Sequence, residues 1–344
     1  MTRADQLRAE ASRRILVKDG AYGTAIQNYK MAEADYRGSY DLKRDQKGNN
    51  DLLCLTRPDL MDDICASYCE AGADVLGTNS FNANVISQAD YGAEHLVDEI
   101  NLAAARIVRE VADRFTAEDG RPRFVAGALG PTNKTLSLSP DVNDPGYREV
   151  DFDFVSKVYA QQAAALIEGG ADFILIETVF DTLNAKAAIH GVRSLGGDIP
   201  LMLSMTLTDL SGRNLSGHSI EAFWASVRHA RPLSIGLNCS FGADQLRPHV
   251  ATLSGIADTL LMAYPNAGLP NDLGEYDEGA ATTAAFIHEW ASRGQINIVG
   301  GCCGTTPAHI RAIADTVAGL PPRKIAAKPV LTQLAGLDPM TLAA

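Results

Sequence analysis

Eight short apolar runs, most of them separated by segments with a helical pattern, constrain the fold of this chain more than any other feature. Each run ends in small or polar residues, and continuous apolar runs of this length are typical of strands buried on both faces of a parallel sheet. The eight predicted strands lie within residues 15–20, 73–80, 123–131, 171–179, 200–207, 233–240, 259–266 and 296–303.

Helical patterns occupy most of the intervening segments, at residues 57–73, 152–171, 181–197, 219–230, 242–257, 278–294 and 306–320. The recurring sequences GGAD and AGAD end helices and begin strands, where glycine suits the position that follows a helix. Eight strand-then-helix units in a chain of 344 residues predict a (β/α)8 TIM barrel. A doubly wound sheet is the alternative, but the first turn, DGAYGT, lacks the G-x-G-x-x-G pattern usual at the ligand site of that fold.

Two long segments interrupt the regular spacing, residues 28–57 after the first strand and residues 131–151 after the third. Loops this long in a compact domain are more often functional than idle, and both would lie at the C-terminal end of the barrel. The pattern is lost near residue 321. We therefore predict one barrel domain at residues 1–320 and a linker-like tail at residues 321–344.

Charge and hydropathy exclude several classes of function. The net charge of −12 argues against nucleic acid or an anionic membrane as a partner. No run of 18 apolar residues is present, and the charged N-terminal segment lacks the apolar core of a secretory signal. We therefore expect a cytoplasmic protein, in which the six cysteines are free thiols or metal ligands.

Cysteines gather at the predicted strand ends. Cys239 ends the sixth strand, and the adjacent pair Cys302 and Cys303 ends the eighth. A disulfide within the pair is disfavoured, because neighbouring Cα atoms lie about 3.8 Å apart and an unstrained disulfide needs about 4.4–6.8 Å. Strands six and eight are one strand apart in a barrel, so the three thiolates can converge on Zn²⁺ and leave a fourth position open, as in catalytic zinc sites. Cys54, Cys65 and Cys69 are interpreted as core residues.

Two further features lie at strand ends on the same face. Glu177 follows a strand of apolar residues, where it could act as a base, bind a cation or accept a backbone amide; a buried salt bridge is the alternative. The turn DGAYGT, Asp19–Thr24, brings backbone amides close to a ligand through Gly20 and Gly23 and could hold a carboxylate or a phosphate.

Seven motifs together resemble the homocysteine-binding module of cobalamin-dependent methionine synthase, in the order of that family, from about residue 15 to residue 320. The motifs are KDGAYGT, KGNNDLLCLTRPD, TNSFNAN, ETVFDTLNAKAA, GLNCSFGADQLRP, YPNAGLPN and GGCCGTTPAHI. Betaine-dependent members of the wider homocysteine methyltransferase group share the first turn, the lone cysteine and the cysteine pair. The KGNNDLL and PNAGLPN stretches look more like the cobalamin-dependent branch.

The resemblance implies a TIM barrel with zinc on Cys239, Cys302 and Cys303 and the thiolate of homocysteine as the fourth ligand. It implies that Glu177 binds the substrate ammonium and that amides near Gly20 and Gly23, in the turn from Asp19 to Thr24, bind its carboxylate. The implied activity is a zinc-dependent methyltransferase that activates homocysteine for methyl transfer from methylcobalamin and forms methionine. Methyl transfer from betaine or S-methylmethionine is the alternative, and a non-catalytic zinc-binding scaffold is a third.

The chain contains no D-x-H-x-x-G motif of cobalamin-binding modules. We therefore expect methylcobalamin on a partner, and we expect cobalamin- and folate-binding modules or subunits of methionine synthase as partners beside homocysteine. Whether the chain is a module of a longer enzyme or a subunit of a split one stays open at this point.

Overall fold

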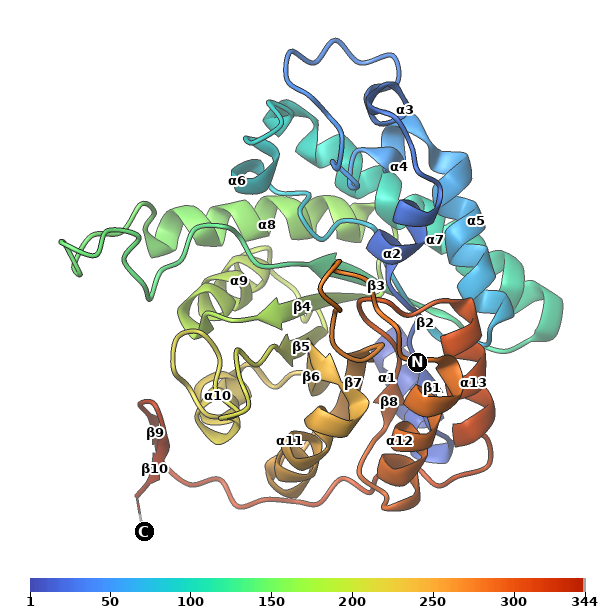
Figure 1. Ribbon diagram of the computed structural model, residues 1–344. Coiled ribbons are helices and arrows are strands. Elements are labelled where there is room, and N and C mark those ends of the chain that lie inside the picture. Colours follow the sequence, from blue (N-terminus) through green and yellow to red (C-terminus); the bar gives the residue numbers. More distant parts are fainter. Residues whose placement is uncertain (343–344) are drawn as a thin grey trace.

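The computed structural model describes residues 1–342, and their strands form one parallel barrel (Figure 1). Neighbouring strands follow the order of the sequence, and the sheet closes where β1 pairs with β8 and a bridge joins Lys18 to Val75. Each predicted run overlaps one strand, so the (β/α)8 prediction is confirmed. The strands are β1 Leu16–Val17, β2 Val75–Gly77, β3 Phe124–Leu129, β4 Phe173–Val179, β5 Leu201–Met205, β6 Ser234–Gly242, β7 Leu260–Asn266 and β8 Ile298–Val299.

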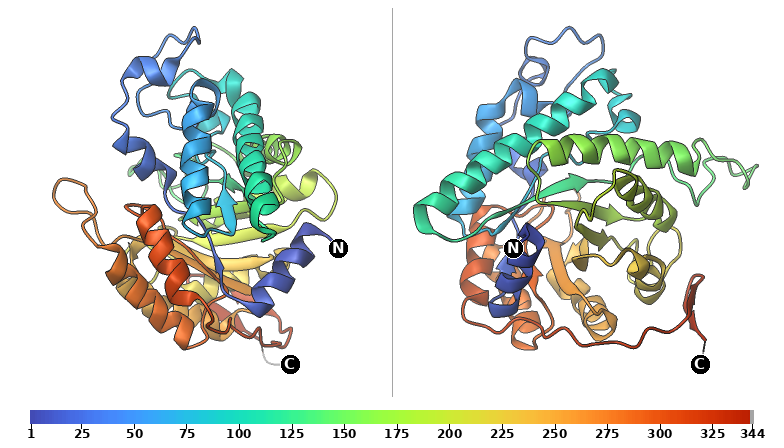
Figure 2. Two further views of the ribbon diagram at one scale, coloured as in Figure 1. Left: turned by 90° about the vertical axis from the view of Figure 1, so that its right-hand side faces the viewer. Right: turned by 180° about the vertical axis from the view of Figure 1, so that it is seen from behind.

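Helices surround the barrel and cover one of its ends. The outer helices are α5 Pro58–Glu70, α7 Val97–Asp119, α8 Phe152–Glu168, α9 Thr182–Ser194, α10 Ile220–Val227, α11 Ala243–Ile256, α12 Ala280–Ser292 and α13 Pro307–Val317. The N-terminal helix α1, Arg3–Arg13, buries Leu7 and Ala11 against side chains of the barrel interior. The side view in Figure 2 (left) places α1 at one end of the barrel and the loop after β7 at the other. No helix among residues 1–342 combines the length and the apolar character that a membrane span requires.

The aspartate of the recurring AGAD and GGAD sequences has a structural role at the strand starts. Asp74 and Asp172 precede β2 and β4, and each carboxylate accepts a backbone amide of the neighbouring strand, Val17 at 2.9 Å and Val125 at 2.8 Å. Arg14 and Arg121 pair with Asp74, which is fully buried. These carboxylates therefore align neighbouring strands at the end of the barrel remote from the cysteines.

Both predicted insertions follow strands and lie at the C-terminal end of the barrel. The first carries the short helices α3, Glu33–Arg37, and α4, Leu53–Thr56, after α2, Tyr22–Asn28. The second, residues 131–151, has no helix or strand and extends away from the barrel beside α8 (Figure 1). A further short helix, α6 Val85–Gln88, follows β2. Cys54, Cys65 and Cys69 are buried in the core, as predicted.

The tail beyond residue 320 contains more structure than a linker requires. Its strands β9, Gln333–Ala335, and β10, Pro339–Thr341, form an antiparallel hairpin next to α10. The hairpin is held by the Ser219 amide, which donates to Leu337 at 2.9 Å, and by an Arg213–Asp338 ion pair at 2.9 Å. The boundary at residue 320 stays a prediction, and the last two residues of the predicted tail, 343–344, lie outside the described part of the chain.

Candidate functional site

Three cysteine thiols meet at the C-terminal end of the barrel. Cys239 comes from the end of β6 and Cys302 and Cys303 from the segment after β8, and the three sulfur atoms lie within 4.8 Å of one another. The sulfurs of Cys239 and Cys303 are 3.7 Å apart. Zinc–sulfur bonds of about 2.3 Å in a tetrahedron set neighbouring sulfurs about 3.8 Å apart, so these residues fit a zinc ion. Within residues 1–342, no other group of His, Cys, Asp and Glu side chains has a comparable arrangement.

An irregularity in the pairing of β6 places the Cys239 thiol in the cluster. The register between β6 and β7 shifts after Asn238, and Cys239 and Ser240 adopt φ angles of 58° and 62°. Residues other than glycine rarely adopt positive φ, at a cost on the order of 1–3 kcal/mol, so surrounding contacts must hold this backbone. The Ser240 hydroxyl supplies one such contact, because it accepts the Leu207 amide at 2.6 Å.

The side chain of Asn238 supports the same irregularity from inside the barrel. Its oxygen accepts hydrogen bonds from the Thr178 amide at 3.0 Å and from the Ser204 hydroxyl at 2.6 Å. Its NH2 group donates to the Thr178 hydroxyl at 2.8 Å and lies 3.9 Å from the Cys302 sulfur. Asn238 therefore connects the ends of β4, β5 and β6 to the cysteine cluster.

A tight turn presents the cysteine pair. The Cys302 amide donates to the Pro265 carbonyl at 2.7 Å, and the Gly304 amide donates to the Thr24 hydroxyl at 2.9 Å. Gly304 has a φ of 79°, and a Cβ atom there would lie 2.3 Å from the Cβ atom of Tyr276. The glycine is therefore required by both the turn and the close approach of Tyr276.

Contacts among the three thiols shift their pKa values in different directions. Hydrogen bonds from Cys239 and Cys302 lower the pKa of Cys303 to about 3. Contacts with Cys239 and Cys303, together with burial, raise the pKa of Cys302 well above its usual value. The cluster thus already stabilises one thiolate, which is the form of cysteine that binds metals.

A cavity of about 430 Å³ opens beside the cluster. Its size lies within the range of small-molecule sites. Every residue predicted for the site lines this one cavity: Asp19, Gly20, Gly23, Thr24, Glu177, Cys239, Cys302 and Cys303. The cavity also receives residues of the two loops that follow β1 and β2.

Buried charges form the floor of the cavity. The Lys18 ammonium lies 2.7 Å from the Asp19 carboxylate and 4.7 Å from the centre of the Tyr264 ring. Asp19 also accepts the Gly77 amide at 2.7 Å and is fully buried, so its side chain is occupied within the protein. Glu177 is only partly buried and accepts the Tyr264 hydroxyl at 3.0 Å. Burial raises the pKa of Glu177, while Lys18 and Tyr264 act in the opposite direction.

The glycine turn contributes backbone rather than side chains. No acceptor among the described residues takes a hydrogen bond from the amides of residues 20–24. A Cβ atom on Gly20 would meet the Tyr68 ring at 2.7 Å, so the backbone there must approach closely. The Thr24 hydroxyl accepts the Gly304 amide, as described above. Free amides at the start of α2 are the groups that a carboxylate or phosphate would need.

Comparison with protein families identifies the chain. The model of the homocysteine S-methyltransferase family matches residues 16–317, which is most of the chain. The chain belongs to the homocysteine S-methyltransferase family. It is therefore a methyltransferase of the homocysteine type, and the cysteine cluster with its cavity lies within the matched region.

Solved structures agree on the fold of this homocysteine S-methyltransferase. The oxidized form of the Escherichia coli homocysteine methyltransferase MmuM matches with a TM-score of 0.70 at 21% identity, over 88% of this chain and 95% of that one. The metallated form of MmuM matches with a TM-score of 0.69 at 21% identity, over 88% of this chain and 96% of that one. At this identity the likeness concerns the fold.

The residues that support the site could be predicted only in part. Asn79 and Asn238 stand at predicted strand ends, and Lys18, Asp51 and Tyr264 lie within the family motifs, but no role was predicted for any of the five. One signal was available for Lys18, since it is a charged residue within an apolar run. Asn238 contacts Thr178 of β4 and Tyr264 contacts Glu177 of β4, so these contacts cross the barrel, and no local pattern indicates them.

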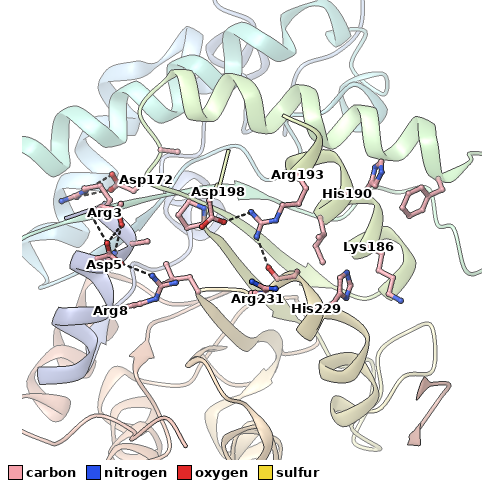
Figure 3. Close-up of a pocket in the computed structure, with 18 residues that line it drawn as sticks. Arg3, Asp5, Arg8, Asp172, Lys186, His190, Arg193, Asp198, His229 and Arg231 are labelled. Atoms are coloured by element: carbon pink, nitrogen blue, oxygen red, sulfur yellow. Dashed lines mark hydrogen bonds and ion pairs between the residues drawn. The ribbon is translucent and has the colours of Figure 1, made fainter. Parts of the chain in front are cut away.

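A larger hollow, about 1250 Å³, lies at the opposite end of the barrel of this homocysteine S-methyltransferase (Figure 3). Its charged residues mostly pair with one another, as in Arg3–Asp172 at 2.9 Å and Arg8–Asp5 at 3.3 Å. It contains none of the predicted site residues. Since barrel enzymes place their chemistry at the C-terminal end of the strands, we assign this hollow a structural role.

Proposed function

We propose that this chain binds and activates homocysteine for methyl transfer, forming methionine, with zinc held by Cys239, Cys302 and Cys303. The observation that carries the proposal is the cluster of three sulfurs, of the size that zinc requires, at the wall of a cavity. A free thiol has a pKa near 8.5, so only a few per cent is thiolate at neutral pH. Zinc bound here would supply the missing step by deprotonating the substrate thiol at its open position.

Residues of the cavity would orient the amino-acid part of homocysteine. The free amides of residues 20–24 offer donors to its carboxylate. Glu177 lines the cavity and accepts a hydrogen bond from the Tyr264 hydroxyl. Its carboxylate also offers an acceptor to the substrate ammonium. Asp19 and Thr24 hold the turn in place through Gly77 and Gly304. No general base is needed in this scheme, because the thiol loses its proton on metal binding.

For the methyl donor we propose methylcobalamin carried by a partner module or subunit, beside a folate-binding one. Support comes from the KGNNDLL and PNAGLPN stretches, which resemble the cobalamin-dependent branch of the family. Betaine or S-methylmethionine as the donor is the alternative. We also propose that the protein works in the cytoplasm, where its thiols stay reduced.

Replacement of the cysteine pair tests the metal role. Cys302→Ala and Cys303→Ser should each lose zinc, measured by atomic absorption, together with turnover of homocysteine with methylcobalamin. Cys65→Ala, a buried thiol outside the cluster, serves as the control and should keep its zinc. Full turnover by a variant shown to be zinc-free would refute the mechanism.

Donor assays with the purified chain test the choice of donor. We expect turnover with methylcobalamin and none with betaine or S-methylmethionine. The reverse result would assign the chain to the alternative branch.

Calorimetry separates an enzyme from a scaffold. Homocysteine should bind the zinc-loaded protein with release of about one proton, detected as a dependence of the heat on the buffer. A structural zinc with a closed coordination shell would take up no thiol, and absence of binding would favour the scaffold.

A further inference from the structure

Asp51 differs from the other buried aspartates in its partners. Asp19, Asp74 and Asp181 are also almost fully buried. Lysine or arginine side chains pair with Asp19 and Asp74, and Asp181 accepts two amides of the loop after β3 and one of its own helix. Asp51 is 4% exposed and accepts one hydrogen bond from another residue, the Asn82 amide at 2.9 Å on Oδ1.

No lysine, arginine or histidine among the described residues forms an ion pair with Asp51. Burial therefore raises the pKa of its carboxyl to about 7. A buried carboxylate that lacks donors costs free energy, and such a group in a native protein calls for an explanation. Perturbed carboxyl groups of this kind gather in functional clefts.

The position of Asp51 supplies the explanation. It lines the same cavity as Glu177 and the cysteine cluster. It lies just before α4 in the loop after β1, and a bond from the Asn79 side chain to the Asn50 carbonyl at 2.8 Å fixes that loop to the end of β2. The carboxyl group is thus held at the cavity wall formed by the first two βα loops.

We infer that Asp51 binds the ammonium group of the amino-acid substrate and shares it with Glu177. The inference rests on the proposed function, because it takes homocysteine as the ligand. An ammonium has three N–H donors, and a buried one needs more than a single acceptor. Glu177 already accepts Tyr264, and the free side of Asp51 provides a second anionic acceptor. The substrate cation in turn supplies the partner that Asp51 lacks within the chain.

If Asp51 had only a structural role, that role would be to accept the hydrogen bond from the Asn82 amide, which joins two loops. The variant Asp51→Asn preserves this bond, because the side-chain oxygen remains an acceptor, and removes only the charge. Asp41→Asn, an exposed acid on the same insertion, is the matched control for loss of one charge.

The test measures binding of three thiols to the zinc-loaded protein by calorimetry. Homocysteine carries both polar groups, 4-mercaptobutanoate lacks the ammonium, and 3-aminopropane-1-thiol lacks the carboxylate. In Asp51→Asn we expect affinity for homocysteine and for 3-aminopropane-1-thiol to fall about tenfold or more, as for a lost charged hydrogen bond. In Asp51→Asn, the affinity for 4-mercaptobutanoate and the zinc content should not fall. The unfolding temperature of the control, Asp41→Asn, should not fall either.

Two results would overturn the inference while the proposed function stands. An unchanged affinity for homocysteine would show that Asp51 does not touch the substrate. An equal loss for all three thiols would show that Asp51 only shapes the wall. If the unaltered zinc protein bound none of the thiols, the proposed function would fail, and the inference with it.

Discussion

Asn238 shows how one side chain can position the proposed metal ligand Cys302. It makes three hydrogen bonds to residues of β4 and β5 and lies against Cys302. Asn238→Leu should lower the free energy of unfolding by about 2–4 kcal/mol, because the buried partners lose their bonds. Zinc affinity should fall as well. Urea unfolding and competition with a chelator measure the two effects, and Asn143→Leu on the exposed loop is the control.

The raised pKa of Asp51 also predicts how the stability of the protein depends on pH. Its folded pKa of about 7 lies above the unfolded value of 3.8, so folding favours the protonated form. This contribution is fully present below about pH 4 and is lost as the pH rises through about 7. The stability of Asp51→Asn relative to the unaltered protein should therefore increase from pH 4 to pH 8. Thermal unfolding of both proteins across this range checks the trend, and a constant difference would contradict it.

Single residues could be predicted from the sequence where strand ends carry the chemistry. Cys239, Cys302, Cys303 and Glu177 follow apolar runs directly, so the barrel topology brings them to one face. Lys18 and Asp51 were missed because their roles depend on which groups they meet across the barrel. Asp19 was predicted as a substrate contact, and its partners, Lys18 and Gly77, are visible only in the structure.

At the scale of elements, the acids that begin strands are expected to contribute strongly to stability. Asp74 is fully buried and holds Arg14, Arg121 and the Val17 amide. Asp74→Asn keeps the amide contact but removes the buried charge that Arg14 and Arg121 share, while Arg14 retains Glu10 at 3.2 Å. The free energy of unfolding should fall by about 2 kcal/mol, because both arginines are partly exposed to water.

The control is Asp113→Asn, which breaks an exposed helical pair with Arg109. This pair should contribute no more than about 0.5 kcal/mol. Urea titration of both variants compares the two. Equal losses would contradict a special role for the strand-start carboxylate.

The barrel strands and most outer helices were predictable, and α7 is the main exception. No helix was predicted at residues 97–119, yet α7 is the longest helix of the described chain. Its first turn lacks a side-chain cap, and a short 3-10 turn, Glu94–Leu96, leads directly into it. The polar capping residue that usually marks the start of a helix in a sequence is therefore absent. The eighth run, in contrast, was predicted over residues 296–303, but only Ile298–Val299 form ladder pairs, because the rest turns toward the site.

For the whole molecule, Arg323 indicates where the folded unit ends. Its side chain is buried and donates to the carbonyls of Ser254 and Thr259, while its own carbonyl accepts Asn297 at 2.9 Å. We propose a barrel unit that includes this anchor, slightly beyond the predicted boundary at residue 320. A chain of residues 1–324 should bind zinc and unfold at nearly the temperature of the full chain.

A chain of residues 1–320 should be less stable by about 2 kcal/mol or more, because several buried groups lose their bonds. Calorimetric unfolding of the two truncated proteins tests this. Equal unfolding temperatures would show that the boundary at residue 320 is adequate.

The order of the proposed metal ligands along the chain determines when the metal site can form. Cys239 precedes the cysteine pair by more than sixty residues, and β8 joins each neighbour through only two residue pairs. During synthesis, the chain emerges from the ribosome with one ligand long before the other two. The proposed zinc site is therefore complete only after the final strand has inserted between β7 and β1, and zinc bound there would link that strand to β6. Metal binding would then report that the barrel has closed, and amide exchange around residue 298 should slow when zinc is added.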